Sequence, residues 1–132
     1  MPHLMLQYSS SLEGFQATDA LLALNTTLVD TGRFHAVDIK SRALPCDTVC
    51  IGLGSPQDAF VHVDLRVMEG RENVFLRHLP MLLLGVLEEQ LPPAHRGTVH
   101  CSIELSELYE GLYAKRLHRP GILQGIPRGL WR

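Results

Sequence analysis

The sequence lacks a hydrophobic stretch long enough to cross a membrane. Its longest run without a polar side chain is the nine residues Leu79–Leu87, whereas a transmembrane helix needs about 20. The opening residues Met1–Gln7 contain no basic region of the kind that begins a secretory signal peptide. We therefore expect a cytoplasmic protein that does not enter a membrane.

Cysteine is scarce, and neither sign of charge is in large excess. Three cysteines cannot all pair within one chain, so free thiols in a reducing compartment are the simplest expectation. The 12 Lys+Arg and 14 Asp+Glu give a net charge of -2, whereas nucleic-acid-binding domains are usually strongly basic. Cys46 and Cys50 have the spacing of one metal-ligand pair, but no second Cys or His pair completes a site. We therefore predict neither a nucleic-acid partner nor a metal.

Strand and helix patterns alternate along the chain. Period-two alternation predicts strands over 3–8, 35–44, 59–68 and 98–106, with Pro45 ending the second and a loop over 45–58. Apolar residues at helical spacing predict helices over 12–31 and 71–91. Ser10 and Glu13 have the spacing of a capping box, and Gly32 is a candidate C-terminal cap.

This order predicts an α+β fold of the form β-α-β-β-α-β. Two right-handed β-α-β units place both helices on one face of a four-stranded sheet, which leaves the other face to solvent or to another subunit. We assign these two units to one domain, residues 1–110. Residues 111–132 form a basic C-terminal extension, and its last eighteen residues hold five basic side chains and no acidic one.

Pro2 follows Met1 directly, at the start of the first expected strand. Methionine aminopeptidases generally remove Met before a small second residue such as proline, which would leave a free secondary amine. A terminal amine titrates at about 7.7–8 in model peptides, and burial beside cations lowers that pKa. Pro2 is therefore a candidate general base near neutral pH.

Several short motifs carry a resemblance to a known family. They are Met1-Pro2-His3, Asn25–Leu28 with Thr31-Gly32, Ile39-Lys40-Ser41-Arg42, Ala59–Val63, Gly70-Arg71 and Ser102–Glu104. In this order, over residues 1–109, they resemble the 5-carboxymethyl-2-hydroxymuconate isomerases of the tautomerase superfamily.

The resemblance implies a homotrimeric, cofactor-free isomerase of aromatic-compound catabolism that moves a proton along a conjugated hydroxy-dienoate. Pro2 occupies the position of the family's base. Arg42 and Arg71 match arginines of the family pattern and become expected ligands of a small carboxylate substrate. Lys40 stands where family members have arginine. It keeps the charge but lacks the planar fork that binds a carboxylate in a bidentate manner.

Two alternative functions, from other classes of protein, stay open at this point. The same element order describes ferredoxin-like regulatory domains, which bind small effectors without catalysis. A tautomerase-like trimer that serves only as an interaction protein also fits, since Lys40 already departs from the family pattern. In the ferredoxin-like alternative, Pro2 would be incidental.

Overall fold

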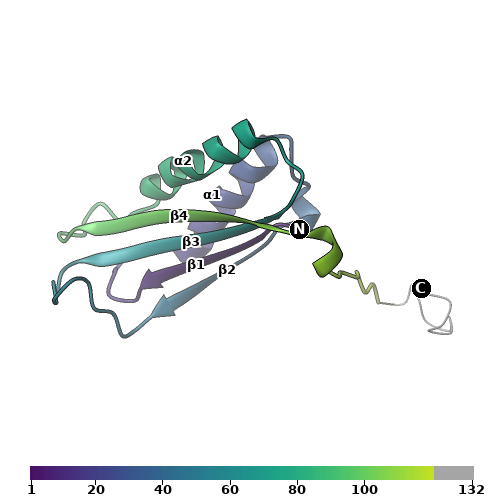
Figure 1. The fold of residues 1–132 in the computed structure, drawn as a ribbon. Helices are drawn as coiled ribbons and strands as arrows, with labels where there is room; N and C mark the ends of the chain where they lie inside the picture. Colours follow the sequence, from purple (N-terminus) through teal and green to yellow (C-terminus); the bar gives the residue numbers. More distant parts are fainter. Residues whose placement is uncertain (121–132) are drawn as a thin grey trace.

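The computed structural model describes residues 1–120, so residues 121–132 of the expected basic extension lie outside the described part. Four strands form one mixed sheet in the order β2-β1-β3-β4, with bounds β1 His3–Ser9, β2 Lys40–Cys46, β3 Ala59–Met68 and β4 Val99–Leu108. β1 and β2 are parallel, β3 and β4 are parallel, and β1 and β3 are antiparallel. Helices α1 (Ala17–Asp30) and α2 (Asn73–Glu89) lie on the same face of the sheet (Figure 1). The predicted α+β fold is confirmed.

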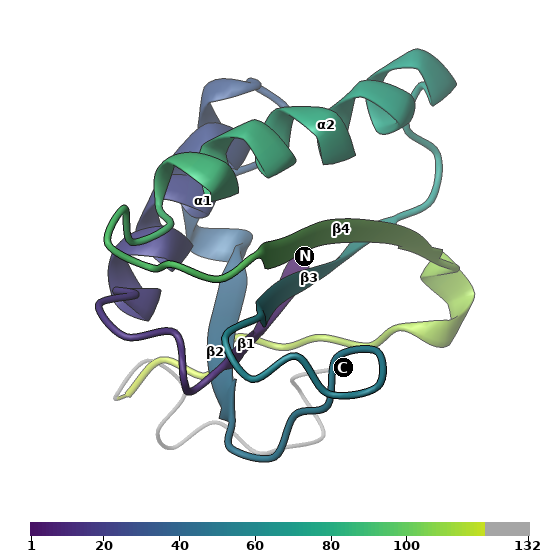
Figure 2. The same cartoon turned by 90° about the vertical axis from the view of Figure 1, so that its left-hand side faces the viewer.

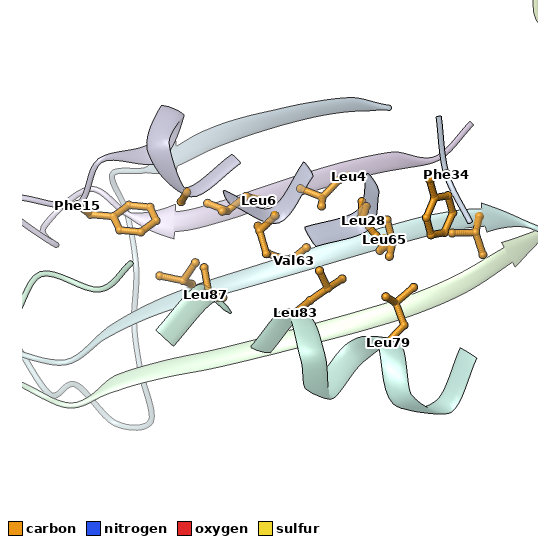
Figure 3. Packing of buried hydrophobic residues seen from close by; sticks show 14 of the residues in the cluster. Leu4, Leu6, Phe15, Leu28, Phe34, Val63, Leu65, Leu79, Leu83 and Leu87 are labelled. Carbon is orange, nitrogen blue, oxygen red and sulfur yellow. The ribbon is translucent and has the colours of Figure 1, made fainter. Parts of the chain in front are cut away.

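The core lies between the sheet and the two helices. Strand alternation directs Leu4 and Leu6 of β1, with Val63 and Leu65 of β3, toward the helices. Figure 3 shows these side chains meeting the apolar stripes of the helices, which include Leu28, Leu79, Leu83 and Leu87. The apolar alternation seen in the sequence therefore defines the covered face.

Helix α1 begins later than the capping-box spacing predicts. The segment before it folds as turns, with Gly14 at a φ of +84°, and the helix starts at Ala17 without a side-chain cap. A left-handed residue cannot continue a right-handed helix. Leu12 and Phe15 on either side of this turn are buried in the core. The prediction of a helix start near residue 12 was wrong.

Strand β2 is displaced toward the C-terminus relative to the prediction. Residues Ala36–Asp38 form a short 3-10 helix, η1, and the strand runs on through Pro45 to Cys46. Pro45 pairs with Tyr8, and β2 is an edge strand of the sheet. An edge strand tolerates proline because one row of its backbone groups needs no partner. The prediction that Pro45 ends the strand was therefore wrong.

The chain after β4 returns across one end of the sheet. A second 3-10 helix, η2 (Glu110–Leu112), follows β4, and the segment after it passes from the β4 edge toward β1 and β2 (Figure 2). Contacts of Tyr113 with His3 and of Lys115 with Asp38 anchor this segment. Within residues 1–120, no helix has the length and apolarity to cross a membrane.

Candidate active site

Pro2 lies buried at the N-terminal end of β1. Its carbonyl oxygen accepts a hydrogen bond from the backbone N–H of Lys40 at 3.1 Å, which couples the N-terminus to the start of β2. Because β3 is antiparallel to β1, and β4 is parallel to β3, both of these strands end where β1 begins. One end of the sheet thus gathers the N-terminus and the residues that follow β3 and β4.

Two lysines near the N-terminus both contact Asp38. The Nζ of Lys40 donates to the carbonyl oxygen of Asp38 at 2.9 Å, and the Nζ of Lys115 lies 3.0 Å from the Asp38 carboxylate. Burial, followed by the charges of Lys40 and Lys115, lowers the pKa of the Met1 amine, and Asp38 only partly opposes this. A terminal amine at this place is therefore biased toward its neutral, proton-accepting form.

Arg42 projects from β2 on the sheet face that the helices leave uncovered. Lys40 pairs with His3 and Arg42 pairs with Met5, so the predicted placement of Lys40 and Arg42 on one face is confirmed. The guanidinium of Arg42 donates to Nδ1 of His3 at 3.3 Å, and Nε2 of His3 lies 3.1 Å from the hydroxyl of Tyr113. Strands β1 and β2 and the returning chain segment are linked by these side chains.

A cleft of about 600 Å³ opens beside these residues on the uncovered face. Its polar lining comprises His3, Arg42, Asp64, Arg66 and Tyr113. Its apolar lining is formed by Met5, Leu108 and Leu112. Two guanidinium groups beside apolar walls suit an anionic organic ligand, because arginine binds carboxylates through paired N–H donors.

Arg71 lies at the same end of the sheet but is held by other contacts. It follows Gly70, which ends the turn after β3 with a φ of +99°. Its guanidinium donates to the carbonyl oxygen of Arg33 at 3.0 Å and lies 4.2 Å from the ring centre of Phe34. Burial, followed by the charge of Arg33, lowers its pKa. The structure thus places Pro2 directly before β1, and Lys40 and Arg42 on the adjoining strand β2, whereas Arg71 contacts residues that follow α1.

Two other features of the described chain suit an anionic ligand less well. Near β4, ligand atoms of His62, Asp64 and Glu104 lie within 4.8 Å of one another, a grouping that could hold a cation. A smaller hollow of about 280 Å³ lies beside the 47–58 loop, and its charged lining residues are Asp47 and Asp58. Neither feature has an arginine or lysine that offsets its carboxylates, whereas two arginines accompany Asp64 in the cleft, so the cleft beside Arg42 is the better candidate.

The sequence patterns did not single out the residues that the returning segment supplies. Tyr113 reaches His3 across 110 positions, and Lys115 reaches Asp38 across 77. The sequence beyond Tyr113 has no helical or strand period from which a position could be assigned. His3 and Arg66 could have been found from the sequence. His3 directly follows Pro2, and Arg66 is one of the polar residues that alternate with apolar ones along β3.

Comparison with protein families gives a match over almost the whole described chain. The family model described as 5-carboxymethyl-2-hydroxymuconate isomerase matches residues 2–118. The chain belongs to this family. The predicted family and the prediction of an isomerase are thereby confirmed, and the matched range includes both the N-terminal strand and the returning segment with Tyr113 and Lys115.

Several solved structures share the fold of this chain. A 5-carboxymethyl-2-hydroxymuconate isomerase from Deinococcus radiodurans R1 is 27% identical, with a TM-score of 0.82 over 89% of this chain and 90% of that one. A 5-carboxymethyl-2-hydroxymuconate delta-isomerase is 20% identical, with a TM-score of 0.72 over 89% of each chain. A structure titled as a fused 4-OT symmetric trimer is 14% identical, with a TM-score of 0.69 over 89% of this chain and 94% of that one. A search of curated proteins gives no match.

Proposed function

We propose that this isomerase-family protein acts on 5-carboxymethyl-2-hydroxymuconate, with the amine of Pro2 as general base once Met1 is removed. The amine takes a proton from the 2-hydroxyl side of the dienol system and returns one to carbon five. The observation that supports this most directly is that Pro2 is buried at the start of β1, where the charges of Lys40 and Lys115 lower the pKa of the terminal amine. The cations that lower the pKa of a Met1 amine would act in the same way on an amine at Pro2.

The proposed substrate carries three carboxylates, so its binding requires several cations. Arg42 lines the cleft, and Lys40 lies two residues before it on β2, where its backbone N–H donates to the carbonyl oxygen of Pro2. We propose Arg71 as the third cation. Its contacts within residues 1–120 use one N–H group and one face of its guanidinium, so other donors remain for a carboxylate. Neither the base nor these cations needs a cofactor for the proton transfer.

The same proposal includes a homotrimer that works in cytoplasmic aromatic catabolism. On the uncovered face of the sheet, polar side chains such as Gln7, His62 and His100 alternate with Met5 and Phe60, a mixed surface that suits a subunit interface. The three free cysteines, Cys46, Cys50 and Cys101, suit a reducing compartment. The fused 4-OT protein in the comparison is described as a symmetric trimer.

The reaction is tested by following the ultraviolet absorbance of the conjugated dienol while the protein and the substrate are mixed. We expect enzyme-dependent loss of that absorbance without any added metal or organic cofactor. Absence of conversion by protein that lacks Met1 and is correctly folded would instead favour a non-catalytic binding or interaction module.

The assembly is tested separately by sedimentation equilibrium at micromolar concentration. We expect a mass three times the 14.7 kDa of one chain. A monomer at this concentration would contradict the trimer and any substrate contact contributed by a neighbouring subunit.

A further inference from the structure

We propose that Tyr113 binds the substrate directly, through a hydrogen bond from its hydroxyl to a substrate carboxylate, and that His3 is the positioning residue that orients this hydroxyl. The inference rests on the proposed function for the identity of the substrate. Its basis is a pair of hydrogen bonds, one between Arg42 and His3 and one between His3 and Tyr113. All three residues line the 600 Å³ cleft.

The donor and the acceptor in each of these two hydrogen bonds follow from the chemistry of arginine. A guanidinium only donates hydrogen bonds, so Nδ1 of His3, 3.3 Å from Arg42, must present a lone pair. A neutral imidazole with an unprotonated Nδ1 carries its proton on Nε2. That N–H therefore donates to the oxygen of Tyr113, 3.1 Å away. A doubly protonated His3 would set its Nδ1–H against the N–H of Arg42.

The surroundings of His3 favour this neutral form. Burial lowers the pKa of His3, and the charges of Arg42 and Lys40 lower it further. The ring of Tyr113 meets the ring of His3 edge to face, with centroids 6.0 Å apart and planes at 72°, which limits rotation of the phenol. Both the hydrogen bond and the ring contact thus fix where the hydroxyl lies.

With its oxygen accepting from His3, the Tyr113 hydroxyl keeps its own proton to donate. None of the hydrogen bonds formed among residues 1–120 uses that proton. Tyr113 borders the cleft beside Arg42 and Arg66, so a ligand carboxylate there can accept from the hydroxyl and from a guanidinium together. Asp64 lines the same cleft and would repel a carboxylate placed against it. The carboxylate therefore belongs on the side of Arg42 and Tyr113.

The competing role for Tyr113 is to anchor the returning segment to β1. Tyr113→Phe removes the hydroxyl and its hydrogen bond to His3 but keeps the ring contact that also anchors the segment, so it weakens anchoring less than it weakens binding. Hydrogen bonds to charged groups contribute about 1.5–3 kcal/mol, which corresponds to a loss of about tenfold or more in affinity. We expect KM for the substrate, and Kd for the unreactive probe propane-1,2,3-tricarboxylate by calorimetry, to rise by that factor. Tyr109→Phe is the matched control because Tyr109 is exposed, and we expect it to change neither constant.

His3 supplies a second test that needs no variant. Long-range proton–nitrogen NMR of the labelled wild-type protein should show a neutral His3 ring with its proton on Nε2. A proton on Nδ1, or a charged ring at neutral pH, would overturn the orientation assigned to the Tyr113 hydroxyl, whether or not Tyr113→Phe folds.

The outcomes separate this inference from the proposed function. If the wild type isomerises the substrate but Tyr113→Phe has unchanged KM and Kd, the function stands and the role of Tyr113 is wrong. If the wild type binds the tricarboxylate, with tenfold loss in Tyr113→Phe, but isomerises nothing, the site stands and the reaction is wrong. If the wild type neither binds the tricarboxylate nor isomerises the substrate, both proposals are overturned.

Discussion

The two faces of the sheet differ in chemistry although the same strands form them. On β3, Leu65 is 1% exposed beneath the helices, while its neighbour Arg66 points to the uncovered face and lines the cleft. The covered face is almost purely apolar and determines whether the chain folds. The other face carries arginine, histidine and carboxylate groups, and the cleft beside Arg42 lies at its end near Pro2. We therefore expect stability and binding to depend on alternate residues of the same strands.

Adjacent substitutions on β3 test this division most strongly. Leu65→Ala should lower the free energy of unfolding by about 2–5 kcal/mol, because it removes buried methyl groups and leaves a cavity. Arg66→Ala should change it by no more than about 0.5 kcal/mol, as exposed positions usually do. Chemical denaturation of both variants measures the difference. Equal destabilisation would show that the uncovered face contributes to folding as much as the core does.

A substitution on the uncovered face should affect binding and leave folding intact. Arg42→Ala removes a cation from the cleft and the donor to His3. We expect KM to rise, with a loss of about 1.5–3 kcal/mol in transition-state stabilisation from kcat/KM. Arg77→Ala, on the exposed side of α2, is the matched control and should leave the kinetics unchanged. If Arg42→Ala had the same kinetics as the wild type, Arg42 would be a solvated surface residue that does not bind the substrate.

The smallest expected effect concerns the pH dependence. Lys115 is one of the cations that lower the pKa of the terminal amine, so Lys115→Gln should raise that pKa. The base is active when unprotonated, and the acid limb of the pH–rate profile should therefore move to higher pH. Arg116→Gln, at the exposed neighbouring position, should leave the limb in place. A shift to lower pH in Lys115→Gln would contradict the role given to Lys115.

Local sequence patterns predict much of the fold. The predictions that were wrong failed because of tertiary structure. The strand alternation of 59–68 predicts β3 well because its residues point in turn to the core and to the uncovered face of the sheet. The start of α1 was misplaced because Gly14 adopts a left-handed turn that buries Leu12 and Phe15. Pro45 stayed in a strand because β2 is an edge, and strand order is not visible in a local pattern.

The candidate site was predictable only where its residues lie close together in the sequence or match a family motif. Pro2, Lys40 and Arg42 were found in this way. Tyr113 and Lys115 meet their partners through the return of the chain across the sheet, which has no periodic signal. The division of the chain at residue 110 remains a prediction. Tyr113 and Lys115, which follow residue 110, contact His3 and Asp38. The start of the basic extension therefore lies beside the candidate site.

The central claim is that the amine of Pro2 is the base, and one measurement tests it most directly. Preparations that retain Met1 and preparations that lack it are separated, verified by intact mass, and assayed for isomerase activity at equal concentration. In the retained form the Pro2 nitrogen is an amide with no lone pair available to a proton. We predict that nearly all activity resides in the fraction that lacks Met1. Equal specific activity in the two fractions would contradict the account.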